Sequence, residues 1–560
     1  MTALLWGGRA GRVLLALPLL ALLAVFLGWP LGTLVARALA LDGAGVGETV
    51  RALAADRYYW ERAAFTTGQA LASTALTLLV GVPAAYALAR VRFPGRALLS
   101  TLLTVPFVLP TLVVALAFQQ LLGPRGWLND ALALAGVGPL RPLGTLWAIL
   151  AAHVFYNVSI VVRLVGAAWS TLDPATEEAA RTLGAGRVRA FTASTLPQLA
   201  PAIAAAGALV FMFCFTSFGV VLVLGAGNPR LDTLEVVVYR LTTRLVDLPS
   251  AALLALVQIA VTLGALVLYG MLQRRGTAAL RSGAAPLRPW RALRPGARAL
   301  LGLLLAGLLA FVVLPLAALV HAAFTLGASE LVTARHVQAL FRDTERVSYI
   351  APLDALRWSL TFATGASLAA AAIGLAAALV LRRLRGRVGA AADALLMAPL
   401  AVPAVVLGFG YLVTFNRGVL DLRGSPWLLF AAHTLLAYPF VVRALVAALR
   451  ALDPQLAEAA RVLGASPRRA WRHVEFPLIA PALAAGAAFA FAISIGEFGT
   501  TLLLQRREFA TIPIAIYDAL ARPGDANVGR ALVLACGLLL VTGSVVALID
   551  RVRYRVTGVL

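Results

Sequence analysis

Lysine is absent from this chain of 560 residues, and all 48 of its basic residues are arginine. A phosphate-binding P-loop needs a lysine to reach the terminal phosphates of a bound nucleotide. The chain is therefore not expected to hydrolyse ATP by itself. Energy for any work that it does must come from a partner subunit or from an ion gradient.

Other reactive groups are also scarce. The two cysteines, Cys214 and Cys536, lie within apolar runs, which is typical of small core residues rather than of a disulfide framework. The five histidines are scattered, and no Cys/His cluster has the spacing of a zinc site. No nucleophile lies in a recognisable arrangement with a base. We therefore predict a chain that is not an enzyme, with no catalytic residues, no metal site and no bound cofactor.

Charged residues make up only 13% of the chain, whereas 61% of its residues are hydrophobic. Apolar runs of about twenty residues, each long enough to cross a bilayer, recur along the whole sequence. The formal charge of +23 could indicate a nucleic-acid partner, but the arginines lie in short loops beside apolar runs. The composition predicts an all-α polytopic protein whose partner is the lipid bilayer, not nucleic acid.

The first apolar run follows Arg9 and Arg12 and could be a signal peptide, with 36–38 resembling a cleavage site. We expect an uncleaved helix instead, because the run is long and a first span is needed to place the later loops. We predict twelve spans, at about 13–34, 66–89, 101–121, 143–167, 201–226, 250–272, 299–322, 358–381, 394–415, 427–449, 480–504 and 529–549.

A polar stretch occurs twice between these runs. The first copy, 173–185, begins Asp-Pro, contains Glu-Ala-Ala and a glycine, and reaches a Leu-Pro pair. The second copy, 453–465, has the same features at a constant offset of 280 and reaches Phe-Pro. Asp before Pro favours a helix start, and glycine can take the left-handed conformation that ends a helix. Each copy predicts a short exposed helix, a glycine turn, and a second helix closed by the hydrophobic-Pro pair.

The repeat extends beyond these loops. His153 matches His433 at 280, and Phe218-Gly219 matches Phe498-Gly499 at the same offset. An even number of spans in each half gives both halves the same orientation. We predict about twelve transmembrane helices as two parallel six-helix repeats, with the first at 1–272, a basic linker at 273–298 and the second at 299–560.

Arginine is distributed unevenly between the two sets of loops. Loops on the N-terminal side hold 27 arginines and eight acids, whereas the opposite loops hold eighteen arginines and sixteen acids. Cytoplasmic loops of membrane proteins carry an excess of basic residues. We therefore expect both termini and both Glu-Ala-Ala loops to be cytoplasmic.

The duplicated loop, with Glu-Ala-Ala, three residues, Gly and then a hydrophobic-Pro pair thirteen positions later, resembles the cytoplasmic loop of binding-protein-dependent ABC importer permeases. In that family the loop docks into a cleft on the ATPase subunit. The resemblance implies a bacterial cytoplasmic (inner) membrane protein with two copies of an ATPase subunit, which uses the ATP, and an extracytoplasmic substrate-binding protein. The implied coupling residues are Glu178, Ala179, Ala180, Gly184, Pro197, Glu458, Ala459, Ala460, Gly464 and Pro477.

Glu497 is the only acid that the sequence does not assign to a loop. An acid at membrane depth is costly, so it should face a cavity, a partner or water. It could line the transport pathway, or it could form a structural hydrogen bond or pair with an arginine such as Arg443. Its repeat mate is Ser217, which is the other candidate pathway residue. We expect His153 and His433 to be packed, hydrogen-bonded histidines.

Fused, double-length permeases of this family resemble two groups most, those for thiamine and its phosphates and those for ferric iron. The stretches 211–219, 224–227, 126–128, 152–157 and 494–499 are similar to the thiamine group, as are Thr233-Leu234-Glu235 and Tyr239. The resemblance favours thiamine, with ferric iron as the alternative. A secondary transporter of major-facilitator type also has six plus six spans in parallel halves. It would give no reason for two matched Glu-Ala-Ala loops.

Overall fold

The protein is described here from a computed structural model that covers residues 9–39, 46–279, 287–325, 332–341, 350–384, 386–416, 421–422 and 424–557. Within these ranges, ten helices are long and apolar enough to cross a membrane, or up to twelve if each of two bent pairs is one span. The predictions of an all-α membrane protein and of about twelve spans in two repeats are confirmed.

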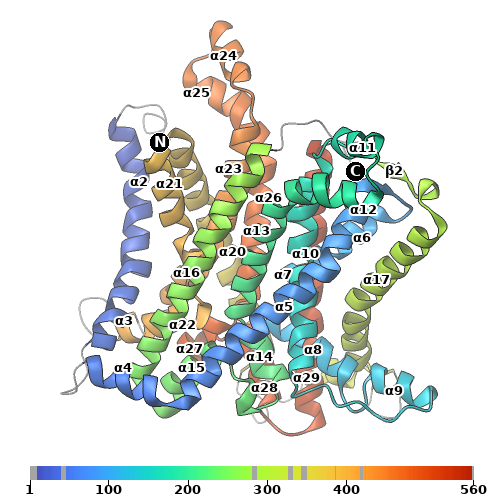
Figure 1. Ribbon diagram of the computed structural model, residues 1–560. Helices are drawn as coiled ribbons and strands as arrows, with labels where there is room; N and C mark the ends of the chain where they lie inside the picture. Colours follow the sequence, from blue (N-terminus) through green and yellow to red (C-terminus); the bar gives the residue numbers. More distant parts are fainter. Residues whose placement is uncertain are drawn as a thin grey trace.

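The first half contains α2 to α16 (Figure 1). Its helices are α2 (Arg9–Leu23), α3 (Trp29–Leu39), α4 (Val46–Ala55), α5 (Arg57–Arg90), α6 (Arg96–Leu102), α7 (Val105–Val108), α8 (Thr111–Leu122), α9 (Trp127–Leu134), α10 (Leu146–Ser170), α11 (Ala175–Thr182), α12 (Arg187–Ala190), α13 (Leu196–Phe215), α14 (Gly219–Leu224), α15 (Leu234–Arg240) and α16 (Leu248–Ala279).

The second half contains α17 to α29. Its helices are α17 (Pro295–Ala323), α18 (Arg335–Phe341), α20 (Pro352–Arg383), α21 (Gly386–Met397), α22 (Ala404–Thr414), α23 (Pro426–Ala451), α24 (Pro454–Val462), α25 (Pro467–Ala470), α26 (Phe476–Ile495), α27 (Gly499–Leu504), α28 (Ile512–Leu520) and α29 (Asp525–Thr557).

The third span of each half is bent rather than straight. The helices before and after Pro110 meet at 109°, and those before and after Pro403 meet at 90°. Each proline forces an extended residue before it, with ψ of 141° at Leu109 and 116° at Val402. The predictions of continuous helices over 101–121 and 394–415 are therefore wrong.

The two halves exchange their first helices. Helices α2 and α3 of the first half pack against α20 and α22 of the second, and α17 of the second half packs against α8 of the first. The Trp29 ring meets the Phe415 ring edge-on at 5.5 Å, and Phe311 meets Phe118 at 6.1 Å. This exchange buries apolar surface between the halves and joins them into one body.

Glycines allow the longest helices within each half to cross closely. A Cβ added at Gly81 of α5 would lie 2.7 Å from Val161 of α10, and one at Gly374 of α20 would lie 2.7 Å from Val441 of α23. Val161 and Val441 differ by the 280-residue offset of the repeat, so the same crossing is built twice. Small residues at such crossings let helices in a membrane pack by close van der Waals contact.

A short parallel strand pair, β1 (Val91–Arg92) with β2 (Arg288–Pro289), ties the end of the basic linker to the loop after α5. Trp290 also contacts Phe93, with ring centroids 6.0 Å apart. Residues 280–286 of the predicted linker lie outside the described residues. The domain boundaries at 272 and 298 stay predictions.

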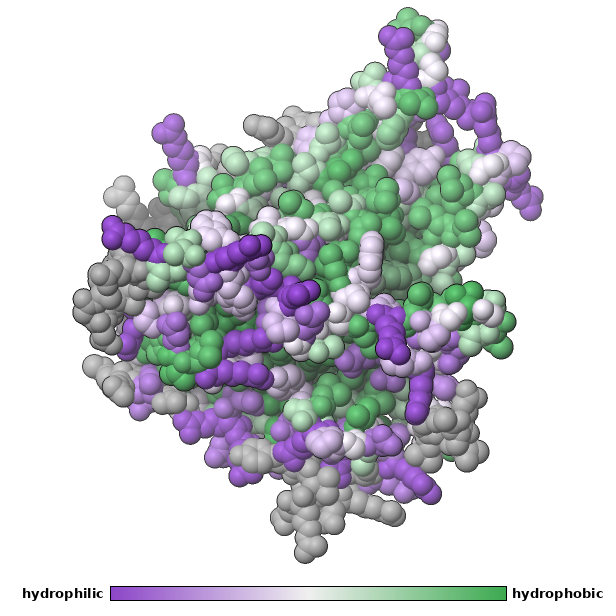
Figure 2. All heavy atoms as spheres, turned by 60° about the horizontal axis from the view of Figure 1, so that its bottom comes forward, coloured by the Kyte–Doolittle hydropathy of each residue, from purple (hydrophilic) through white to green (hydrophobic). Residues whose placement is uncertain are grey.

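Large apolar side chains are exposed along the long helices. Leu79, Leu303 and Leu540 are each at least 70% exposed. Figure 2 shows hydrophobic side chains spread over the middle of the visible surface, with hydrophilic ones in the lower part of the view and on the projection at its upper right. Such a surface would be unfavourable in water and is what a bilayer would cover.

Candidate functional site

The two Glu-Ala-Ala loops form pairs of short helices that extend from one side of the molecule, α11 with α12 and α24 with α25 (Figure 1). We call this the loop side; the described ends of the chain also lie there (Figure 1). Gly184 and Gly464 have φ of +88° and +84°, which confirms the predicted left-handed turns. Leu183 and Leu463, the residues just before them, are each 88% exposed. Of the predicted coupling residues, Ala180 and Ala460 are half-buried, and the exposed ones are Glu178, Ala179, Gly184, Pro197, Glu458, Ala459, Gly464 and Pro477.

The prediction that the hydrophobic-Pro pair closes the second loop helix is wrong. The helix runs on from Arg187 to Phe215 as one membrane-spanning candidate. Pro197 lacks an N–H, and the helix accommodates it with a π-helical turn at 191–195. In this turn the Leu196 N–H donates to the Phe191 carbonyl. The second loop repeats this turn at 471–475. Each loop is therefore continuous with a transmembrane helix.

The two helices that continue from the loops break at equivalent points in the membrane. Helix α13 ends at Phe215 and α14 begins at Gly219, while α26 ends at Ile495 and α27 begins at Gly499. The predicted spans 201–226 and 480–504 both contain such a break. A Cβ at Gly219 would lie 2.5 Å from the Thr111 hydroxyl, so only glycine fits this close approach.

His153 is hydrogen-bonded to the unwound residues of the first break. Its Nδ1 lies 2.9 Å from the Ser73 hydroxyl and its Nε2 lies 2.8 Å from the Ser217 hydroxyl. The Thr233 hydroxyl also donates to the Ser217 carbonyl at 3.2 Å. These bonds join α5, α10 and the segment before α15 to the unwound residues, and they confirm the predicted hydrogen-bonded histidine.

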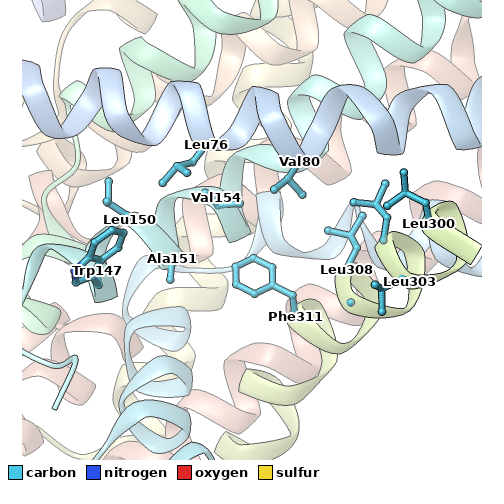
Figure 3. A pocket seen from close by; sticks show the side chains of 12 residues that line it. Leu76, Val80, Trp147, Leu150, Ala151, Val154, Leu300, Leu303, Leu308 and Phe311 are labelled. Carbon is cyan, nitrogen blue, oxygen red and sulfur yellow. The ribbon is translucent and has the colours of Figure 1, made fainter. Parts of the chain in front are cut away.

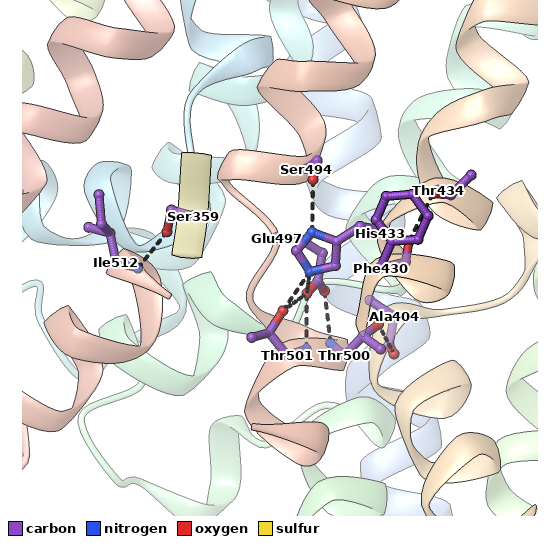
Figure 4. A network of polar contacts seen from close by, with 10 residues as sticks. All are labelled: Ser359, Ala404, Phe430, His433, Thr434, Ser494, Glu497, Thr500, Thr501 and Ile512. Atoms are coloured by element: carbon purple, nitrogen blue, oxygen red, sulfur yellow. Dashed lines mark hydrogen bonds and ion pairs between the residues drawn. The ribbon is translucent and has the colours of Figure 1, made fainter. Parts of the chain in front are cut away.

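His433 holds the second break in the same way (Figure 4). Its Nδ1 lies 2.8 Å from the Ser494 hydroxyl and its Nε2 lies 3.0 Å from the Thr501 hydroxyl. The carboxylate of Glu497 accepts hydrogen bonds from the Thr500 N–H at 2.8 Å, the Thr501 N–H at 2.9 Å and the Thr501 hydroxyl. Glu497 thus satisfies the free N–H groups at the start of α27, an anion-favouring position.

The pairing of Glu497 with an arginine, which the sequence left open, does not involve Arg443. That arginine lies 3.3 Å from Asp393 instead. The ionisable side chain beside Glu497 is His433, whose Nε2 lies 3.6 Å from the carboxylate. The structural interpretation of Glu497 as a hydrogen-bonding group in the helix bundle is thereby supported.

Glu235, in helix α15, is another buried acid, so the prediction that Glu497 is the only acid outside a loop is wrong. Its side chain is completely buried. One carboxylate oxygen accepts from the Val405 N–H at 3.0 Å, and the other accepts from the Gln258 amide at 3.3 Å. Since Val405 belongs to α22, this acid of the first half caps a helix of the second. Its sequence neighbours Asp232 and Thr233 are polar, so the segment looked like a loop in the sequence. The apolar residues from Val236 onward were a signal that Glu235 belongs to a buried helix.

A cavity of about 330 Å³ lies between the halves, where the broken helices meet. It is lined by residues of α7, α8, α10, α13, α14, α15, α22, α23, α26 and α27, and by both unwound segments. The sequence-predicted pair Ser217 and Glu497 are both at its wall, together with Glu235. The aromatic rings in the wall are Phe107, Tyr156, Phe213, Phe218, Phe440, Phe489 and Phe498.

A second hollow, of about 570 Å³, lies between α5, α10 and α17 (Figure 3). Its lining is apolar and includes Leu76, Leu150 and Phe311, and the side chains of Trp147 and Leu303 beside it are largely exposed. Apart from the indole N–H of Trp147, its lining offers no charged or hydrogen-bonding side chain to recognise a polar substrate. The cavity between the halves is therefore the candidate site. Among the described residues, no group of three or more His, Cys, Asp and Glu side chains could hold a metal ion.

Two interlocked halves, exposed loop helices continuous with membrane spans, and a cavity at the break of those spans define a transport permease. Residues 78–277 and again 370–556 match the family described as the inner membrane component of binding-protein-dependent transport systems. The chain belongs to this family. It is a multi-pass permease of ABC importers, whose permease subunits are not themselves enzymes, and the major-facilitator alternative is excluded.

Among curated proteins, the chain is similar to the thiamine transport system permease protein ThiP of Brucella abortus, with 30% identity over 522 residues, covering 92% of this chain and 91% of that protein. The protein of the same name from Escherichia coli K12 is 29% identical over 497 residues, covering 87% of this chain and 89% of the relative. Among solved structures, a bacterial ABC transporter for import of the acidic polysaccharide alginate is similar at 21% identity, with a TM-score of 0.39, over 47% of this chain and 93% of that chain. The two family matches and the similarity to ThiP over 92% of the chain confirm the resemblance to a fused, double-length importer permease.

Proposed function

We propose that this permease imports thiamine or its phosphates, receiving the substrate from an extracytoplasmic binding protein and releasing it into the cytoplasm. The observation that carries the proposal is the similarity to thiamine permeases along 92% of the chain. A cavity with two carboxyl groups and several aromatic rings supports the same cargo, since thiamine is an organic cation with two aromatic rings.

The two loops are proposed to dock on two copies of an ATPase subunit, which uses the ATP. Two observations support this docking. Repeat-related residues of the loops, such as Leu183 and Leu463, are exposed, and each loop is continuous with a broken membrane helix. Closure of the ATPase pair would then move α13 and α26 relative to each other. The 27 arginines of the loop-side segments support a cytoplasmic position for this side and for both termini.

Glu497 and Ser217 are proposed to lie on the transport pathway. Their support is that both line the cavity and that each is held by a repeat-related histidine, His433 and His153. A carboxylate on one side and a hydroxyl on the other make this pathway chemically unequal in its two halves. An acid at membrane depth is costly and is retained mainly where it has a function.

Uptake into proteoliposomes tests the cargo. The chain is reconstituted with its ATPase and binding protein, ATP is supplied at the loop side, and accumulation of radiolabelled thiamine is compared with that of radiolabelled ferric iron. We expect ATP-dependent accumulation of thiamine and none of iron. Iron accumulation without thiamine accumulation would replace the proposed cargo with the alternative.

A further inference from the structure

The aromatic rings around the cavity form two layers. The first layer includes rings of α13 and α26 that come before the breaks in these helices, and it is centred on Phe107 of α7. Its ring stacks on Phe489 at 5.7 Å with an interplanar angle of 23°, and meets Phe213 edge-on at 5.9 Å. Phe440 contacts Phe489 at 5.2 Å. Because these rings come from four helices of both halves, any movement between the halves changes their spacing.

The second layer lies at the breaks themselves. Phe218 and Phe498, which are repeat mates, stack at 5.7 Å with an interplanar angle of 23°. Each is backed by a tyrosine, Tyr239 at 5.3 Å from Phe218 and Tyr517 at 5.4 Å from Phe498. The cavity wall thus holds ring faces both before the breaks and at them.

The polar part of the wall has an acidic character. Glu235 and Glu497 contribute carboxyl groups, and among the described lining residues none is an arginine. A cation is attracted by the faces of aromatic rings and by carboxylates, whereas an anion meets no positively charged guanidinium here. The cavity therefore suits a positively charged ligand.

We propose that the cavity is a binding site for one aromatic organic cation, held against the aromatic rings with its positive charge near Glu497. This inference rests on the proposed import function and adds the site at which the permease itself holds its cargo. Pockets for small organic molecules have volumes of about 300–1,000 Å³. The volume of about 330 Å³ is at the lower end of that range and fits a single small molecule.

Direct binding to the permease–ATPase complex in nanodiscs, without the binding protein, tests the site. Radiolabelled thiamine is the probe, measured by equilibrium dialysis, and uncharged thiochrome is the competitor of related shape. The test variants are Phe213→Leu and Phe489→Leu, which keep an apolar side chain but remove the aromatic ring, and Glu497→Gln, which removes a carboxyl group from the wall. The matched control is Phe311→Leu, which removes a ring from the apolar hollow instead.

We expect saturable thiamine binding, and we expect each ring variant to weaken it about two- to thirty-fold, the range of one cation–π contact. Glu497→Gln should weaken it similarly, Phe311→Leu should not change it, and Phe489→Tyr should restore most of it. Thiochrome should compete at least tenfold less well than unlabelled thiamine. Each variant is normalised to the amount of assembled complex recovered by size exclusion.

Two results separate this inference from the proposed function. If the complete system takes up thiamine but the complex shows no binding that depends on these rings, the cavity inference is overturned and the import function stands. If the complex binds thiamine in a ring-dependent way but the complete system never accumulates it, the proposed cargo fails and the site stands. Absence of both overturns both.

Discussion

The turn at Gly184 gives a sharp test of how the loop is built. Its φ of +88° lies in the left-handed region, and a Cβ added there would meet no atom within 4 Å. The effect of Gly184→Val is therefore conformational rather than steric. The left-handed conformation costs an L-residue about 1–2 kcal/mol, so the native turn should become about 5–30-fold less populated relative to alternatives.

Gly186, two residues further on, is the matched control. Its φ of −64° and ψ of 162° are extended values that a β-branched residue adopts readily, and its added Cβ also meets nothing within 4 Å. Gly186→Val places the same side chain in the same exposed loop without the backbone strain. Gly184→Asn gives an intermediate case, because asparagine tolerates the left-handed region better than valine.

The assay is co-purification of the ATPase subunit, followed by substrate-stimulated ATP hydrolysis and uptake in proteoliposomes. We expect Gly184→Val to reduce co-purification or to uncouple hydrolysis from uptake, with normal insertion into the membrane, whereas Gly186→Val should behave as the wild type. Equal damage from both valines would show that side-chain bulk, not the turn, is what matters. Wild-type uptake in Gly184→Val would show that the turn is not needed.

Two further changes test the membrane part. Glu497→Gln replaces one accepting oxygen with an NH₂ group opposite the α27 N–H groups. We therefore expect a lower melting temperature, with a loss of about 1–3 kcal/mol in the free energy of unfolding, and lower uptake per assembled complex. Undiminished uptake per assembled complex would remove Glu497 from the pathway. Gly374→Ala places a Cβ 2.7 Å from the Val441 side chain and should destabilise the complex by about 1–3 kcal/mol in a thermal unfolding assay. Gly307→Ala is the control, because its added Cβ meets nothing within 4 Å and should not change the stability. Equal melting temperatures of the two variants would contradict this packing.

The loops were predictable because their signals are local. Asp453 accepts a hydrogen bond from the Gln455 N–H at the start of its helix, as its position before proline indicated. Gly184 and Gly464 take the conformation that glycine favours after a helix. The repeat offset also predicted that His153 and His433 would play equivalent parts, and both indeed bridge two hydroxyl groups.

The cavity was less predictable because contacts between distant residues build it. Residues 211–224 are largely apolar, which favours a continuous span. Gly219 permits local unwinding, but His153, which is hydrogen-bonded to the unwound Ser217, lies 64 positions away in the sequence. Glu235 is buried by Val405, which lies 170 residues away in the other half. Hydropathy averages over neighbours in sequence and so cannot detect such a partner.

The energy source is the most direct test of the importer account. The purified chain is reconstituted alone under a proton or sodium gradient, and separately with the ATPase and binding protein supplied with ATP, and thiamine accumulation is measured in both. We expect accumulation only in the complete, ATP-driven system, with two ATPase subunits per permease chain. Accumulation by the chain alone under an ion gradient would contradict the account.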